Sequence, residues 1–204
     1  MRWMWIDRIV EFVPGKRLRA VKHVSLAEEY LHDHFPADPS TALPSLPVMP
    51  GSLILEGMAQ SAGLLVGYAS AFREKVVLAK VSRAELHRDV GPGSIIMYCA
   101  EIERLDSTGA STRGDVSLIS LDWSGHSFGA PASERQTECP IAGAAEVIGR
   151  IDLMFSHLDR NMSGQEFPEH NFVFGAAFRT LLTASGIALP HDDPDFSRRA
   201  GKAG

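Results

Sequence analysis

Hydrophobic and polar residues alternate along the first part of the chain, which is the pattern of half-buried β-strands. From residue 6 to residue 24, apolar positions recur between polar ones, and Pro14 and Gly15 interrupt them. Such a dipeptide marks a turn, so we predict a short hairpin over residues 6–24, with the first strand near the N-terminus. Residues 26–31 then predict one or two helical turns.

A proline-rich stretch separates this hairpin from the most apolar segment of the chain. Residues 37–47 contain three prolines in a Ser/Thr/Ala-rich context, directly after Pro36, which excludes a helix or a central strand and predicts a loop. After Pro50 the chain is apolar on nearly every helical face up to Phe72, which predicts a helix of about five turns. A helix that lacks a polar face must be surrounded by protein, so we expect this one to be buried.

The rest of the chain is dominated by strand-like patterns. They cover residues 76–81, 84–87, 95–102, 113–121 and 146–158, with turns at 91–93 and 107–109. One helix followed by an antiparallel meander predicts an α+β fold. Residues 122–143 interrupt the meander as a long excursion, a weaker helical pattern spans 172–182 with Asn171 as its cap, and we expect the last fifteen residues to be loose.

Composition narrows the class of protein. A chain of 204 residues with 45% hydrophobic and 22% charged residues predicts one globular domain, and a formal charge of -5 gives no basic footprint for nucleic acid. The two cysteines, Cys99 and Cys139, form neither a disulfide framework nor a zinc ligand set, which favours the cytoplasm. Charged residues near the N-terminus argue against a signal peptide, and Glu56 with Gln60 argues against a membrane span over residues 51–72.

Glu56 is the charged residue of this otherwise apolar helix. Ser52, Glu56 and Gln60 are spaced four residues apart and form one polar stripe. The carboxyl group could be a structural one, bonded to the backbone or to an arginine. Alternatively, an apolar site disfavours its ionised form and keeps it a proton donor near neutral pH, as a general acid requires.

His34 and Gly51 are the residues that could complete such a site. His34 is the nearest candidate base, although a loop histidine is usually only solvated. His32 and His34 could also hold a metal, but no third ligand is evident, so we expect no metal. The Gly51 N–H lies at the start of the predicted helix, where it would stabilise an enolate-like oxygen or simply begin the helix.

Three motifs together resemble the 3-hydroxyacyl-[acyl-carrier-protein] dehydratases of the FabZ type, and they are residues 34–36 (HFP), 47–52 (PVMPGS) and 55–60 (LEGMAQ). The resemblance implies a hotdog fold, in which an antiparallel sheet wraps one long helix. It also implies a homodimer, in many members a trimer of dimers, with active sites at the subunit interface. In that picture His34 removes the C2 proton of a (3R)-3-hydroxyacyl thioester, Glu56 of the partner protomer helps the hydroxyl leave, and the Gly51 N–H polarises the carbonyl, giving the trans-2-enoyl product of fatty-acid biosynthesis.

The resemblance covers residues 3–121 and 146–159. The related FabA-type dehydratase/isomerases carry aspartate where this chain has Glu56, so dehydration without isomerisation is implied. The chain departs from the family in two segments, residues 39–46 and 122–143, which are insertions relative to it. We therefore expect a hotdog domain over residues 1–160 and a C-terminal extension over 161–204.

The same resemblance sets the expectations for substrate and partner. An acyl chain needs an apolar channel, to which Leu65 could also contribute, and the predicted substrate-binding residues are Phe35, Met49, Pro50, Met58, Gln60 and Ala62. Acyl carrier protein is an acidic partner, for which Lys80, Arg83 and Arg88 are candidate contacts. No cofactor is expected. A hotdog thioesterase and a non-catalytic acyl-binding module remain alternative interpretations.

Overall fold

The computed structural model describes residues 3–119, 145–158 and 173–190. Within these ranges it contains six strands, β1 (Arg8–Val13), β2 (Arg17–His23), β3 (Val76–Leu86), β4 (Ile95–Leu105), β5 (Gly109–Ile119) and β6 (Glu146–His157). The helices there are α1 (Glu29–Asp33), α2 (Gly51–Ala69) and α4 (Ala176–Ala184). The predicted hairpin over residues 6–24 is confirmed as β1 and β2, and the predicted loop over residues 37–47 contains neither a helix nor a strand, only a single backbone bridge.

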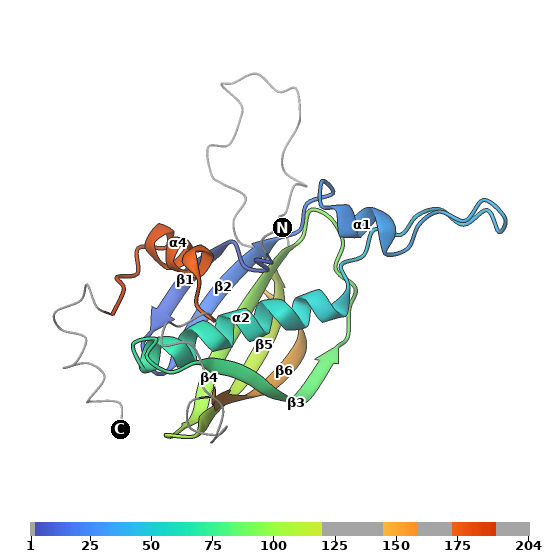
Figure 1. Ribbon diagram of the computed structural model, residues 1–204. Coiled ribbons are helices and arrows are strands. Elements are labelled where there is room, and N and C mark those ends of the chain that lie inside the picture. Colours follow the sequence, from blue (N-terminus) through green and yellow to red (C-terminus); the bar gives the residue numbers. More distant parts are fainter. Residues whose placement is uncertain (1–2, 120–144, 159–172, 191–204) are drawn as a thin grey trace.

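The six strands form one antiparallel sheet in the order β1-β2-β4-β5-β6-β3. The sheet curls around α2, which lies across its concave face (Figure 1). This is the hotdog arrangement, so the predicted α+β class is confirmed. β1 and β3 are the two edges of the sheet, and β3 is by far the longer edge.

Burial of α2 holds the fold together. The helix packs against β2, β3, β4, β5 and β6, and its side chains at Met58, Ala62 and Leu65 are fully buried. Gly57 lies directly on the ring of Tyr98 in β4, where a Cβ would come within 2.3 Å of Tyr98 Oη. No helix in the described parts of the chain is long and apolar enough to cross a membrane.

Several element boundaries differ from the prediction. α1 covers residues 29–33 instead of 26–31, and β4 continues to Leu105 instead of ending at residue 102. The runs 76–81 and 84–87 are one strand, because β3 pairs with β6 along its whole length and absorbs two register irregularities. β5 begins at Gly109, directly after the turn, rather than at residue 113. α2 ends at Ala69 instead of near Phe72, because Ala71 and Phe72 adopt φ values of 55°, which no helix continues through.

The described part of the C-terminal extension packs on the hotdog body. Its helix begins at residue 176, four residues later than predicted. Ile9 N–H in β1 donates to Ser185 Oγ at 3.0 Å, and Tyr68 Oη donates to the Ala188 carbonyl at 3.0 Å. The predicted cap Asn171, the insertion 122–143 and the predicted loose tail lie outside the described residues, save for the final described position, 190.

Candidate active site

His34 is held by the backbone that leads into α2. Its ring Nδ1 lies 2.8 Å from the Val48 carbonyl oxygen, and its backbone N–H donates to the Tyr30 carbonyl at the end of α1. A carbonyl oxygen only accepts, so Nδ1 carries a hydrogen, and in the neutral ring the lone pair is then on Nε2. The residue is exposed, which leaves Nε2 accessible as a base.

The insertion at residues 39–46 does not separate the two motifs that flank it. The chain leaves the body as an arm after α1 and returns before α2 (Figure 1). Leu46 N–H donates to the Phe35 carbonyl at 3.0 Å, and Asp38 and Leu43 exchange backbone hydrogen bonds at 3.0 and 3.2 Å. The arm is therefore closed at its base, next to the contact between His34 and Val48.

Gly51 is the first residue of α2, and its N–H has no partner within the helix. Pro50 precedes it with an extended backbone, and the first turn carries neither a side-chain cap nor an acidic residue. Leu53 and Ile54 donate back to the Pro50 carbonyl, so the amides of Gly51 and Ser52 point beyond the helix end. Such amides, together with the helix dipole, favour a negatively charged oxygen.

Glu56 is oriented by Gln60, one turn further along α2. Gln60 Nε2 donates to Glu56 Oε1 at 2.9 Å and to the Trp3 carbonyl at 2.7 Å, while Gln60 Oε1 accepts from Trp5 N–H at 2.9 Å. The Trp3 carbonyl can only accept a hydrogen bond and the Trp5 N–H can only donate one. Together they fix the orientation of the amide, so that Gln60 Nε2 faces Glu56. Of the two carboxyl oxygens of Glu56, Oε1 is the one that accepts from Gln60.

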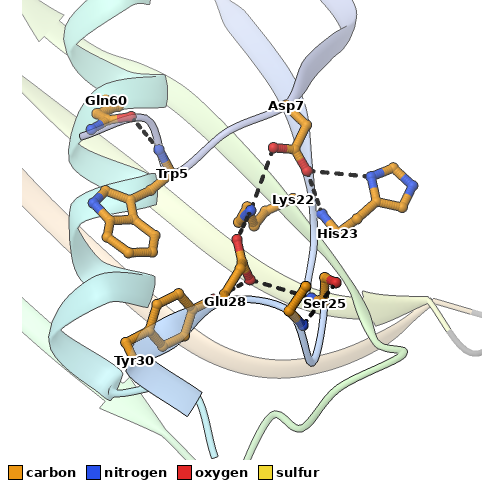
Figure 2. Close-up of polar contacts among 9 residues, drawn as sticks. Trp5, Asp7, Lys22, His23, Ser25, Glu28, Tyr30 and Gln60 are labelled. Atoms are coloured by element: carbon orange, nitrogen blue, oxygen red, sulfur yellow. Dashed lines mark hydrogen bonds and ion pairs between the residues drawn. The ribbon is translucent and has the colours of Figure 1, made fainter. Parts of the chain in front are cut away.

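A polar cluster anchors α1, and Figure 2 shows it beside Trp5 and Gln60. The buried Lys22 ammonium lies 2.6 Å from Glu28 and 3.5 Å from Asp7, and Tyr30 Oη donates to Glu28 at 2.6 Å. Burial tends to raise the pKa of Glu28, but the hydrogen bonds from Lys22, Tyr30 and Ser25 outweigh it and lower that pKa. The Trp5 and Tyr30 rings meet edge to face at 5.2 Å. Trp5 thus contacts both Gln60 and Tyr30 of α1, the helix that ends directly before His34.

A groove of about 290 Å³ begins at Glu56. One wall is the stripe of α2 formed by Glu56, Ala59, Gln60 and Gly63. The opposite wall comes from the first residues of β3 (76–78) and from Phe155 in β6. Its lining is apolar beyond the Glu56–Gln60 pair, so it suits an apolar chain that has a polar group at one end.

The predicted substrate-binding residues occupy three different environments. Phe35 is exposed beside His34, with ring centroids 4.2 Å apart, and Pro50 is half-buried at the start of α2. Gln60 lines the groove. The remaining three belong to the core and lie away from Glu56, and they are Met49, Met58 and Ala62.

For Met58 the reason is helical geometry, because it lies two residues from Glu56 and two residues along a helix correspond to a rotation of about 200°. Positions three, four and seven residues from Glu56 share its face, so helical spacing alone could have identified Ala59 and Gly63. The sequence analysis did not name these two residues. It also did not name Trp3 and Trp5, whose contacts with Gln60 have no local signal in the sequence. A substrate contact of the buried residues stays a prediction.

Metal and surface-charge hypotheses can be compared with the described residues. Within them, no group of three or more His, Cys, Asp or Glu side chains is arranged to hold a metal ion. Two of the three candidate basic residues have acidic partners, since Arg83 pairs with Glu85 at 2.6 Å and Arg88 pairs with Glu146. Lys80 is exposed on β3.

Comparison with known proteins identifies the family. A FabA-like domain matches residues 2–119, which is more than half of the chain. The 3-hydroxyacyl-[acyl-carrier-protein] dehydratase FabZ of Ruminiclostridium cellulolyticum is 33% identical over 117 residues, covering 56% of this chain and 77% of that protein. The FabZ of Listeria monocytogenes is 34% identical over 104 residues, covering 50% and 67%.

Among solved structures, the dehydratase heterocomplex ApeI:P from Xenorhabdus doucetiae is similar at 14% identity and a TM-score of 0.49, over 76% of this chain and 83% of that one. The residues that match the FabA-like domain contain His34, Gly51, Glu56 and Gln60. On the extent of the domain match and the identity to relatives of the FabZ type, the chain belongs to the FabA-like family.

Proposed function

We propose that the protein is a dehydratase that converts a (3R)-3-hydroxyacyl-[acyl-carrier-protein] to the trans-2-enoyl thioester, as a step of fatty-acid biosynthesis. The observation that carries this proposal is the state of His34, which is fixed through Nδ1 and leaves Nε2 free despite the neighbouring insertion. Relatives of the chain are named as 3-hydroxyacyl-[acyl-carrier-protein] dehydratases. The presence of Glu56 instead of an aspartate favours elimination without isomerisation.

The chemistry follows from what each group can do. His34 Nε2 takes a proton from C2 of the thioester, and the electron pair moves to the carbonyl oxygen, where the Gly51 N–H stabilises the enolate. The pair then returns to form the C2–C3 double bond as the bond between C3 and the hydroxyl breaks. Glu56 Oε2 gives its proton to the leaving hydroxyl, so that water departs. Proton transfer from His34 to Glu56 restores the starting state.

We further propose that two copies of the chain complete the site. Of the two sheet edges, β1 is short and Ser185 accepts its Ile9 N–H, whereas β3 is eleven residues long and mostly exposed. Leu78 and Val81 on β3 are 39% and 40% exposed. A long, open edge with apolar side chains favours pairing with another strand. Pairing of β3 with β3 of a second copy would bring a second chain beside the groove at Glu56, and a trimer of such dimers is the larger assembly we expect.

Acyl carrier protein is the partner we propose, because the relatives act on substrates attached to it, as their names state. Lys80 is the best-placed of the candidate contacts, since it is exposed and has no acidic partner among the described ion pairs. The low cysteine count favours a cytoplasmic location.

The test is turnover of a 3-hydroxybutyryl carrier thioester, and of the crotonyl thioester in the hydration direction, by wild type, His34→Ala and Glu56→Gln. Water loss that both substitutions abolish supports the acid-base pair. Thiol release without the enoyl product would indicate a thioesterase instead. A folded wild-type dimer that turns over neither thioester would sink the proposal and favour a binding module.

A further inference from the structure

We propose that the C-terminal extension limits the length of the acyl chain, with Phe174 and Phe178 closing the groove that starts at Glu56. This inference rests on the proposed function. Val173, Phe174 and Phe178 line the same groove as Glu56 and Gln60, although all three lie outside the FabA-like domain at residues 2–119. The segment that distinguishes this chain from the matched domain therefore forms part of its candidate binding site.

The direction of the groove follows α2. Glu56 lies at its polar end and Gly63 two turns further on, and Gly67 follows one turn later. At Gly67 the Phe174 ring lies against the helix backbone, because an added Cβ would come within 2.5 Å of Phe174 Cζ and 2.9 Å of Phe72 Cδ1. This contact lies one turn beyond Gly63, the last residue of α2 that lines the groove. A chain that starts at Glu56 and follows α2 would meet Phe174.

The closing residues are fixed in place rather than loosely attached. Phe174 is 6% exposed, and its ring packs on Phe72 at 4.7 Å and on Phe178 at 6.0 Å. Leu182 in the same extension is buried, and the bonds from Ile9 to Ser185 and from Tyr68 to Ala188 tie the segment to the body. Displacing Phe174 would require breaking this packing, so the ring acts as a fixed stop.

The dimensions set the expected length. Seven residues from Glu56 to Gly63 span about 10 Å along a helix axis. An extended alkyl chain advances about 1.3 Å per carbon with C–C bonds of about 1.5 Å, so the groove takes about eight carbons. The volume of about 290 Å³ lies at the small end of ligand pockets. Short and medium acyl groups are therefore the expected substrates, and chains of twelve or more carbons are excluded.

The experiment compares kcat/KM for 3-hydroxyacyl thioesters of four, eight, twelve and sixteen carbons, each loaded on one bacterial acyl carrier protein. Wild type should favour the four- and eight-carbon substrates over the twelve-carbon one by at least about tenfold. Phe174→Ala should raise the ratio of twelve- to four-carbon kcat/KM by at least about tenfold. Phe178→Ala provides a second route if the first variant does not fold. Leu182→Ala is the matched control, because it removes a buried side chain of the same extension that does not line the groove.

The outcomes separate this inference from the proposed function. Water loss at every length with a flat profile in wild type overturns the inference and leaves the dehydratase intact. A chain-length profile that both phenylalanine variants leave unchanged also overturns the inference. So does an equal change in Leu182→Ala, since general loosening of the extension would then be the cause. Absence of water loss at every length overturns the proposed function and this inference together.

Discussion

The Gln60 carboxamide joins Glu56 to the N-terminal segment, with Nε2 lying 2.9 Å from Glu56 Oε1 and 2.7 Å from the Trp3 carbonyl oxygen. Three of the four hydrogen-bonding positions of this buried amide are thereby used, counting Trp5 N–H as the third partner. The proposed acid is consequently oriented by residues that precede the first strand. Its position depends on the N-terminal segment as well as on α2.

Replacing Gln60 by leucine should harm both stability and turnover. Trp5 N–H and the Trp3 carbonyl lose their side-chain partner, which should lower the free energy of unfolding by about 1–3 kcal/mol. Glu56 also loses its orienting donor, so we expect kcat to fall by at least about tenfold. Urea unfolding and steady-state kinetics measure the two effects.

Ser61→Ala is the control for Gln60→Leu. It removes the buried bond from Ser61 Oγ to the Gly57 carbonyl, 2.8 Å long, on another face of the same helix. It should cost about 1 kcal/mol of stability and leave kcat unchanged. A similar loss of kcat in both variants would show that general loosening of α2, and not the orientation of Glu56, is responsible.

Shortening the arm should leave the site functional. Replacing residues 37–44 by Asn-Gly keeps the bond between Leu46 and Phe35 and the contact between His34 and Val48, and loop shortening changes closure entropy by only about 0.6 kcal/mol per factor of two. We expect kcat within about threefold of wild type on a soluble pantetheine thioester. A deletion that also removes Leu46 opens the base of the arm and should abolish turnover. Loss of activity in the first variant, if it folds, would mean that the arm itself forms part of the site.

Two glycines of α2 should respond to alanine in opposite ways. At Gly57 the new Cβ would overlap Tyr98, with Oη at 2.3 Å and Cζ at 2.4 Å, so Gly57→Ala should destabilise the fold by about 1–3 kcal/mol despite the better helix propensity of alanine. At Gly63 the nearest atom is Phe155 Cε1 at 3.6 Å, an ordinary contact. Gly63→Ala should therefore stabilise the protein by about 0.5–1 kcal/mol. Thermal unfolding of both variants tests the helix packing, and equal shifts of the two would contradict it.

A charge on the β3 edge should dissociate the proposed dimer. Val81→Glu places a carboxylate on each of two paired edges, and desolvating it there is costly. Light scattering coupled to size exclusion should show monomers for this variant and dimers for wild type at the same concentration. Val147→Glu, at another exposed strand valine away from that edge, should remain dimeric. Dimers in both variants would exclude the β3 edge as the interface.

Acid should weaken the attachment of α1. The pKa of Glu28 is lowered in the folded state, so its contribution to stability is fully present above its unfolded pKa of about 4.3 and is lost as the pH falls through the lower folded value. Glu28→Gln removes this dependence. The variant should be less stable than wild type at pH 7, and the difference should shrink as the pH falls below about 4. A constant difference across this range would show that the carboxylate charge of Glu28 does not matter.

The fold could be predicted well where a sequence pattern was long and local. The alternation before residue 24, the apolar run after Pro50 and the strand-like runs from residue 76 on correspond to observed elements. The predicted meander is confirmed only for β4, β5 and β6, because β3 pairs with β6 and not with β4. Boundaries failed where tertiary contacts decided them. α2 stops at Ala69 because Phe72 turns back to meet Tyr68 and Phe174, whose position in a distant segment no local pattern reveals.

The sequence could name candidate site residues but not the contacts that hold them. The resemblance of the three motifs indicated His34, Gly51 and Glu56, and the i, i+4 relation on a helix placed Gln60 beside Glu56, which the structure shows. The partners of Gln60 lie more than fifty residues away in the chain, and Phe174 lies more than a hundred from Glu56. Contacts across such separations depend on the folded topology, so sequence spacing could not reveal them.

Trp5 gives this protein a built-in optical reporter. Its indole meets the Tyr30 ring at 5.2 Å, and its backbone holds the amide that orients Glu56. Ligand binding that shifts Gln60 or α1 should therefore alter tryptophan emission without any added label. Replacing Trp3 and Trp123 by phenylalanine would leave Trp5 as the single emitter, since the chain contains three tryptophans. Acyl-group occupancy could then be followed in real time, in variants that no longer turn over substrate as well as in active ones.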